Sequence, residues 1–539
     1  MYSRMPAAID LLHARAKHRL RVEPFGHLLA FAFAAGAGTE EWEDARSQRN
    51  LDPSDFESAC FSQGLGLASF VERLSFSIGG RTRRPQRKVL LQLLEKPPSD
   101  RASVELRHAI LRELQERTDL AKAVEKIWTC IDALEQAFLS KQLGQRLSYI
   151  HRRVEILRRL IEAIDALNSP FSEAKSDLRR IAEWGRSVQS SPAYHNLHRV
   201  LDHEDNLASI DINLRLGYDG QIRNLSIVRV GENSENPHHR GPWQRFLSRL
   251  RFWFRGYVLR EGELLGRLVE SLFESVQPLV AELINLRLDL EWYLCALDFR
   301  AKVEKAGLSV CIPEWTTDEP TVLRGLFNPF LMNAEHTPIP CNLESPSEQI
   351  VVLTGPNSGG KTRLLQAIGL AQLLAQTGFF VPAAQARLTW RTGLFVSAYE
   401  ESSVDQEEGR LGTELVRIRH VFERIGCDQL VIVDELCSGT NPAEAEALIR
   451  LVLELLDRFG PRAFITTHFL DFARSLSEQP PIRRMSFLQA MLDHRQKPTF
   501  QFGPGVAATS LAAQTAARLG VTREDLEAII ERRMGGRGK

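Results

Sequence analysis

The chain of 539 residues is too long for one ordinary hydrophobic core, so we expect two to four domains. Hydrophobic residues make up 43% of the chain and charged residues 25%, as in ordinary soluble globular proteins. The 68 basic residues are balanced by 68 acidic ones, which excludes a protein that coats nucleic acid through bulk charge but leaves room for a local basic patch.

The cysteines and the apolar stretches both indicate a cytoplasmic protein. None of the seven cysteines shows C-x-x-C spacing, so we expect isolated thiols in a reducing compartment. The longest apolar stretch, residues 25–38, contains His27 and is too short to span a bilayer. It also lacks the cleavage pattern of a signal peptide, and we expect no membrane partner.

The first 87 residues form a mixed region, with helices expected over 6–20 and 54–75. The run at 79–88, GGRTRRPQRK, concentrates positive charge. Such a run is either a solvated loop or helix entry, or a contact to the phosphate backbone of nucleic acid. No aromatic residues interleave with the arginines, so the sequence leaves the two alternatives open.

Residues 88–315 are predicted to form a helical domain, because apolar residues recur at helical spacing up to residue 168 and again over 262–306. The period changes between these stretches. Apolar and polar residues alternate over 207–231 around an Asp-Gly turn, which predicts a β-hairpin. We therefore expect a small β insertion, over 207–260, inside the helical domain.

The second half of this insertion is basic and aromatic together. Residues 243–260 read WQRFLSRLRFWFRGYVLR. The pattern fits an amphipathic helix with buried aromatic and solvated basic residues, a nucleic-acid contact, or a helix on a membrane surface. The residues that would face phosphates are Arg245, Arg249, Arg251 and Arg255.

A phosphate-binding loop is predicted after residue 354. An apolar strand over 350–353 runs into the spacing G-x-x-x-x-G-K-[ST], and a helical pattern follows. Glycines let successive backbone N–H groups point at phosphate oxygens, Lys361 would reach the β- and γ-phosphates, and the Thr362 hydroxyl would bind Mg²⁺. The predicted nucleotide-binding residues are Gly355, Pro356, Asn357, Ser358, Gly359, Gly360, Lys361 and Thr362.

Two further strands are predicted to end in residues with ATPase chemistry. The apolar run 430–433 ends in Asp434, a Mg²⁺ ligand, and Glu435, a general base for the attacking water. The strand over 464–467 ends in His468, which can sense the γ-phosphate. Ligands bind at the carboxyl ends of strands in open α/β sheets, so all of these groups are expected at one edge.

The motifs GPNSGGKT, LVIVDELCSGTNPAEAEAL and ITTHF together resemble the MutS family of ABC-type ATPases, strongly over 320–475. The resemblance implies ATP and Mg²⁺ as cofactors, hydrolysis of ATP to ADP and phosphate, and a homodimer whose subunits complete each other's sites. The matching signature loop is 406–413, with Gly409 and Thr413 as nucleotide contacts. It lacks the family's serine-rich sequence, so we expect slow turnover.

The expected fold is multidomain: a helical lever domain with a small β insertion, an α/β P-loop ABC-type ATPase domain, and a helical C-terminal tail. The family's mismatch-reading domain and its C-terminal Smr domain are not expected. By resemblance, 207–260 is a reduced DNA clamp and 509–530 supports dimerisation. The expected divisions are 1–87, mixed or helical; 88–315, lever; 320–500, ATPase; and 501–539, tail.

The resemblance implies an ATP-gated dimeric clamp on mismatched, branched or unusual DNA, in repair or recombination, associated with the nucleoid when bound. One alternative is an ATPase that acts on the ribosome or its RNA, as some Smr-bearing relatives do. Another is a slow, nucleotide-controlled scaffold.

Overall fold

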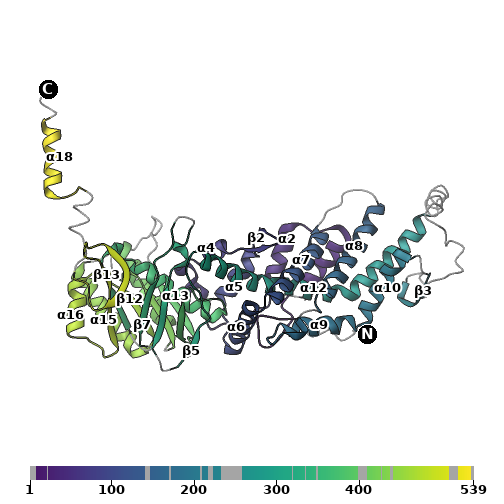
Figure 1. Ribbon diagram of the computed structural model, residues 1–539, viewed down its shortest axis with the longest axis horizontal. Coiled ribbons are helices and arrows are strands. Elements are labelled where there is room, and N and C mark those ends of the chain that lie inside the picture. The colour runs from purple at the N-terminus through teal and green to yellow at the C-terminus, as the bar shows by residue number, and fades with distance from the viewer. Residues whose placement is uncertain are drawn as a thin grey trace. The chain divides into compact units, whose positions relative to one another are not determined.

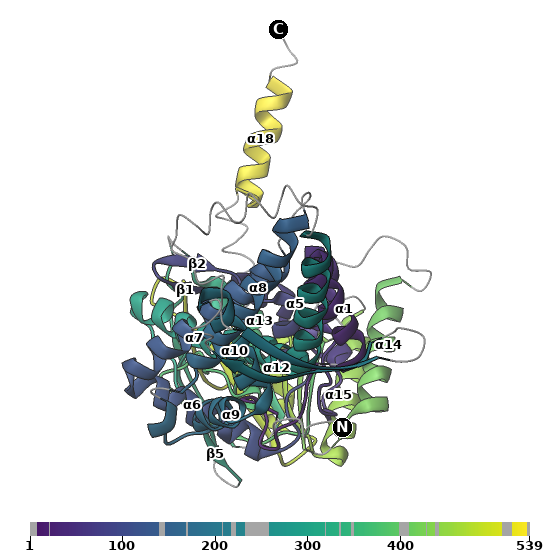
Figure 2. The ribbon, with the colours of Figure 1, turned by 90° about the vertical axis from the view of Figure 1, so that its right-hand side faces the viewer.

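The computed structural model describes residues 8–535 with gaps. These gaps are residues 21, 140–145, 169–170, 207–208, 217–221, 232–257, 318–319, 334–335, 347–349, 398–408, 427, 437–440 and 509–519. The chain forms two compact units (Figures 1 and 2). The helical unit comprises residues 1–51, 76–89 and 101–297, and the α/β unit comprises 52–75, 90–100 and 298–539.

Helices and two short hairpins build the helical unit. Its helices are α1 (Val22–Ala35), α2 (Thr39–Ser47), α6 (Arg101–Glu116), α7 (Thr118–Leu139), α8 (Arg146–Asp165), α9 (Arg179–Gln189), α10 (Pro192–Asn206) and most of α12 (Val258–Lys305). The hairpin predicted over 207–231 is confirmed as the antiparallel pair β3 (Ser209–Leu216) and β4 (Ile222–Gly231). A second hairpin pairs β1 (Phe76–Ile78) with β2 (Arg81–Arg83).

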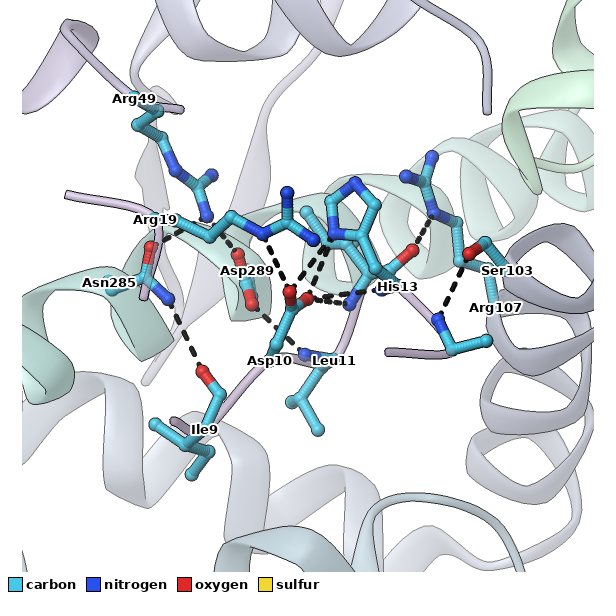
Figure 3. A network of polar contacts seen from close by, with 12 residues as sticks. Ile9, Asp10, Leu11, His13, Arg19, Arg49, Ser103, Arg107, Asn285 and Asp289 are labelled. Atoms are coloured by element: carbon cyan, nitrogen blue, oxygen red, sulfur yellow. Dashed lines mark hydrogen bonds and ion pairs between the residues drawn. The ribbon is translucent and has the colours of Figure 1, made fainter. Parts of the chain in front are cut away.

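The helix predicted over 6–20 is wrong for its described part, because residues 8–20 contain no helix. Side chains of distant helices satisfy the backbone of this segment instead (Figure 3). Asp289 of α12 accepts a hydrogen bond from the Leu11 N–H at 3.1 Å, and Arg107 of α6 donates to the Leu12 carbonyl at 2.8 Å. The buried segment therefore needs no helical hydrogen bonds of its own.

Buried charges accompany this segment (Figure 3). The Asp10 carboxylate accepts hydrogen bonds from Arg19 Nε at 2.7 Å and His13 Nδ1 at 3.0 Å, and Asp289 accepts one from Arg49 at 2.6 Å. Burial would raise the pKa of Asp10, but the hydrogen bonds and charges of His13 and Arg19 outweigh it and hold the pKa well below 3.8. The carboxylate thus stabilises the fold above about pH 4, and this contribution is lost as the pH falls through the folded-state pKa.

Burial is the largest influence on the pKa of Asp289, the second carboxyl group of this cluster. It raises the pKa of Asp289 to about 6, although the Arg49 guanidinium lowers it. A carboxyl whose pKa is raised on folding stabilises the fold at low pH, and that contribution is lost between about pH 4 and 6.

The α/β unit is built around a six-stranded sheet in the order β10-β11-β12-β8-β13-β14. Its strands are β8 (Ile350–Thr354), β10 (Gly393–Ser397), β11 (Gln429–Val433), β12 (Arg462–Thr466), β13 (Met485–Leu492) and β14 (Pro498–Pro504). The first five positions are parallel and β14 is antiparallel to β13. The strands predicted over 350–353, 430–433 and 464–467 are confirmed as β8, β11 and β12. They are apolar along most of their length because helical layers bury them on both faces.

Helices cover this sheet (Figure 1). They are α13 (Lys361–Thr377), α14 (Gly409–Arg424), α15 (Pro442–Phe459) and α16 (Leu470–Glu478). Val431 and Ile465 of the sheet pack with Leu453 of α15 and Phe472 of α16 in one buried core. No helix in the described ranges is long and apolar enough to cross a membrane.

Smaller elements complete the α/β unit. A second sheet has the order β5-β9-β6-β7, from β5 (Glu314–Thr316), β6 (Thr321–Leu326), β7 (Cys341–Ser345) and β9 (Gln385–Thr389). The remaining helices are α3 (Ser62–Leu65), α4 (Leu67–Arg73), the greater part of α5 (Arg87–Glu95) and α18 (Arg523–Gly535). Short 3₁₀ turns lie at Ser58–Cys60, Pro329–Leu331 and Asn357–Gly359. The helical unit has one such turn at Phe171–Glu173.

Replacing Asp10 with asparagine should destabilise the helical unit by about 3–5 kcal/mol, because the change removes the carboxylate that pairs with the buried Arg19. Urea unfolding followed by circular dichroism measures the loss. Arg101→Ala, which breaks the exposed pair with Glu105, is the matched control and should cost less than about 1 kcal/mol. Equal midpoints for the two variants would contradict the prediction.

Candidate functional site

The turn after β8 has the backbone that the predicted phosphate loop requires. Gly355 has φ 141° and Gly360 has φ 86°, in a region that side chains disfavour, and Gly360 caps α13 at its start. The N-terminus of α13 therefore opens directly behind the loop. Unpaired N–H groups and the helix dipole make such a terminus a binding site for anionic phosphate.

Close packing against β13 explains why two loop positions must lack side chains. A Cβ atom built on Gly355 would lie 2.7 Å from Cβ of Ala490, and one built on Gly359 would lie 2.9 Å from the same atom. Both distances are shorter than any tolerated carbon–carbon contact. The loop is thus held in shape by the neighbouring strand as well as by its own glycines.

Lys361 is buried at the centre of this loop. Its ammonium group donates to the carbonyl oxygens of Gly355 at 2.8 Å and Pro356 at 3.1 Å. Burial lowers the pKa of Lys361, and the charges of Glu435 and Asp434 partly oppose this. The loop therefore concentrates a positive charge that anionic phosphate oxygens can satisfy.

The two carboxylates follow β11 at the same edge of the sheet. The Asp434 N–H donates to the Ser397 carbonyl at the end of β10, at 2.9 Å. Thr466, the last residue of β12, donates its hydroxyl to Asp434 Oδ1 at 2.6 Å and accepts from the Glu435 N–H at 2.7 Å. Three strand ends are tied together, which fixes the positions of both acidic residues.

Glu435 has φ 50°, a strained value for a residue with a side chain. The hydrogen bond from its N–H to Thr466 holds it there. Strain of this kind is typical of functional sites, where the surrounding structure fixes a side chain in an otherwise unfavourable direction.

His468 lies two residues beyond β12. The preceding Thr467 donates its N–H to the Leu353 carbonyl of β8 at 3.1 Å, and the imidazole packs on Phe469 with ring centroids 4.1 Å apart. The histidine thus follows a strand that is hydrogen-bonded to the strand before the phosphate loop. This is the edge at which the sequence placed it.

A cleft of about 1100 Å³ adjoins the loop, and it brings several predicted residues together. Ser358, Gly360, Lys361, Thr362 and Asp434 line it. Within the described ranges, no group of three His, Cys, Asp or Glu side chains could hold a metal by itself. A hydroxyl and one carboxylate suit Mg²⁺, which keeps water and phosphate oxygens among its ligands. Thr362 and Asp434 therefore fit the ion expected from the sequence.

An aromatic wall of this cleft was not predicted from the sequence. Phe500 and Phe502 of β14 line it, as does Ile339, which is 55% exposed. Phe500 has φ 56° and is 41% exposed, and its ring lies 3.2 Å from where a Cβ of Gly360 would be. Alternate aromatic residues in an edge strand were the available signal. They offer a flat apolar surface beside the phosphate loop.

The structure describes the remaining predicted site residues only in part. Gly409 begins α14 and Thr413 lies one turn further on, whereas residues 406–408 of the signature loop, and the side chains of Thr413 and Asn357, lie outside the described part of the chain. The four arginines predicted to contact DNA also lie outside the described residues. They are Arg245, Arg249, Arg251 and Arg255.

Comparison with known proteins gives one family. The family model "MutS domain V" matches residues 351–530. The protein named Endonuclease MutS2 from Thermus thermophilus is 35% identical over 182 residues, which are 33% of this chain and 24% of the relative. Its counterparts from Streptococcus equi subsp. equi and Thermomicrobium roseum are 29% identical over 261 residues and 33% identical over 206, covering 32% and 25% of those proteins.

A phosphate loop, an Asp-Glu pair and a histidine at one edge of a mostly parallel sheet define an α/β domain of the ATPase class. The family model places this domain more closely as domain V of MutS. The resemblance to the MutS family that the motifs predicted is confirmed for residues 351–530. The chain's matches span about a quarter to a third of the length of these curated relatives.

Replacing Gly359 with alanine should weaken ATP binding roughly 5- to 150-fold, because overpacking against Ala490 costs about 1–3 kcal/mol. Calorimetric titration with ATP and Mg²⁺ measures the affinity. The double variant Gly359→Ala, Ala490→Gly should recover most of it, while Ala490→Gly alone should bind like the unmodified chain. A double variant as weak as the single one would show that the contact with β13 does not shape the loop.

Proposed function

We propose that this protein is an ATPase of the MutS family that binds ATP with Mg²⁺, hydrolyses it slowly as a homodimer, and acts on mismatched, branched or otherwise unusual DNA. One observation carries the ATPase part: a buried lysine lies at the centre of a glycine loop, with two carboxylates fixed at the end of β11 at the same edge of the sheet. This arrangement suits a triphosphate and an activated water.

The cleft suggests how the nucleotide lies. The phosphates fit the loop and the start of α13, where Lys361 can exchange its carbonyl partners for phosphate oxygens. The adenine base of the nucleotide would then lie beside Phe500, whose exposed ring can stack on it. Ile339 can cover its other apolar surface.

The two carboxylates take different roles because they are held differently. Asp434 already accepts a hydrogen bond from Thr466, so one of its oxygens remains for Mg²⁺, which would neutralise charge on the phosphates when bound. Glu435 would accept a proton from the attacking water, and its strained backbone aims the side chain. His468 would donate a hydrogen bond to the transferred phosphate.

Pairing of subunits would complete the site. The start of α14, with Gly409 and Thr413, would face the partner's γ-phosphate as a helix N-terminus. The tail offers a hydrophobic contact as well: Leu526, Ile529 and Ile530 of α18 are 43–54% exposed. Apolar side chains on one helix commonly mark an interface.

Proteins of the MutS family generally act as dimers on DNA, and the insertion 207–260 is the proposed DNA clamp. Its four arginines, 245, 249, 251 and 255, stay predicted phosphate contacts. The nuclease activity in the relatives' name is not carried over, because the alignments cover only a quarter to a third of those proteins. A cytoplasmic location, with association to the nucleoid on DNA, follows from this proposal.

Lys361→Ala should abolish ATP binding, since it removes the only charge in the described loop that reaches the phosphates. Glu435→Gln should keep binding and lower turnover by about 100-fold or more, because the metal and phosphate contacts remain while the base is lost. Nucleotide titration and phosphate release measure the two effects. Unchanged turnover in Glu435→Gln would remove Glu435 from its assigned role.

The Glu435→Gln variant should form dimers when ATP and Mg²⁺ are added, because trapped nucleotide bridges the two subunits. Light scattering reports the mass. Adding ATP to Lys361→Ala, which binds none, is the control and should leave its mass unchanged. A monomer under every condition at high protein concentration would refute the paired site.

A further inference from the structure

The basic run at 79–88 is part of an ordered hairpin in the helical unit rather than a loose loop. Ile78 pairs with Arg81, so Gly79 and Gly80 form a two-residue turn, and both have positive φ, 56° and 75°. Figure 2 shows β1 and β2 at the margin of the ribbon. Isolated two-stranded hairpins are marginally stable, so something must hold this one in place.

Contacts at the base of the hairpin hold it. Phe76 is buried against Trp128 of α7, with ring centroids 5.2 Å apart, and the Arg83 guanidinium lies 5.9 Å from the same ring. The N–H of Gln86 donates to Glu291 of α12 at 2.8 Å. The basic segment therefore projects from a fixed base.

The far part of the hairpin has no such contacts. All three residues of β2 are exposed, so the strand buries neither face. Arg81 and Arg84 are exposed, and among the described residues no hydrogen bond or ion pair is recorded for either guanidinium. Lys88 differs, because it forms an exposed ion pair with Asp44 of α2 at 2.5 Å. A strand with no buried face and uncompensated arginines points to a partner that carries negative charge.

The neighbouring charges limit where that partner can lie. Helix α2 exposes Glu40, Glu41, Glu43 and Asp44, and the carboxylates of Glu40, Glu43 and Asp44 raise the pKa of Lys88. An anion would be repelled there and attracted to the Arg81–Arg84 end. An extended polyanion with regularly spaced charges can contact the exposed Arg81–Arg84 end without approaching α2. A small anion would instead need an enclosed pocket.

We propose that the β1–β2 hairpin, with Arg81, Arg83 and Arg84, is a second contact to the sugar-phosphate backbone of duplex DNA. The proposal rests on the DNA-binding part of the proposed function and adds a site outside the insertion 207–260. A narrow two-stranded ribbon can lie along a DNA groove, and arginines beside it form bidentate hydrogen bonds to phosphates. Such contacts add affinity but no base preference.

Arg81→Gln, Arg84→Gln should lower affinity for a 30-base-pair duplex about tenfold or more near 100 mM salt. It should also reduce the log–log salt slope by about 2, roughly 0.9 for each lost phosphate contact. Fluorescence anisotropy over a salt series with the full chain gives both values. Arg112→Gln, Arg179→Gln is the matched control, since these arginines of α6 and α9 are also exposed and have no recorded side-chain partner in the described ranges. It should behave like the unmodified chain.

A gain of binding provides a second, independent measurement. Asp44→Asn frees Lys88 and removes a repelling charge, so DNA affinity should rise and the salt slope should steepen. ATP binding should not change in any of these variants.

Several outcomes would overturn the proposal. An unchanged slope in Arg81→Gln, Arg84→Gln, or an equal loss in the control variant, refutes the hairpin while leaving the proposed function intact. If the unmodified chain binds no duplex DNA even at low salt, the DNA-binding function fails and the hairpin contact fails with it. A loss seen only with duplex RNA of the same length refutes the choice of DNA.

Discussion

Charges removed from water govern both units, because each buried charge must find a partner or cost several kcal/mol. In the helical unit, Asp289 of α12 accepts hydrogen bonds from Arg49 and from the backbone N–H of residue 11. In the α/β unit, the ammonium of Lys361 donates hydrogen bonds to two loop carbonyls. The first arrangement fastens distant stretches of chain together. The second arrangement leaves the Lys361 ammonium paired with neutral carbonyl groups. An anionic phosphate would bind this cation more strongly and can replace them.

The register of the central sheet sets the geometry of the proposed nucleotide site. Ser397 pairs with Val433, and Val433 pairs with Ile465, so the ends of β10, β11 and β12 are level. Only then can Thr466 reach both Asp434 and the N–H of Glu435. A slip of one residue would turn every side chain of a strand to the opposite face. The apolar packing that fixes the register therefore also positions Asp434 and Glu435, the residues proposed to act on ATP.

Local signals explain what could be predicted from the sequence. Apolar runs and turn glycines located β8, β11, β12 and the glycine loop after β8 to within about two residues. The segment 8–20 was misjudged because its conformation depends on helices far away in sequence, such as α12. The association of residues 52–75 with the α/β unit, and the position of Phe500 beside Gly360, are likewise tertiary facts. The alternation in β14 alone could not say which cleft its aromatic residues would line.

The pairing of the first residues with α12 also has a consequence for biosynthesis. Ile9 hydrogen-bonds to Glu282, 273 residues later in the chain. At about 5–20 residues per second, a ribosome needs roughly 14 to 55 s to make that partner. Throughout this interval the nascent segment lacks its partners on α12, although Arg107 of α6 is made earlier. The helical unit can therefore close around this segment only late in translation, after α12 has been made.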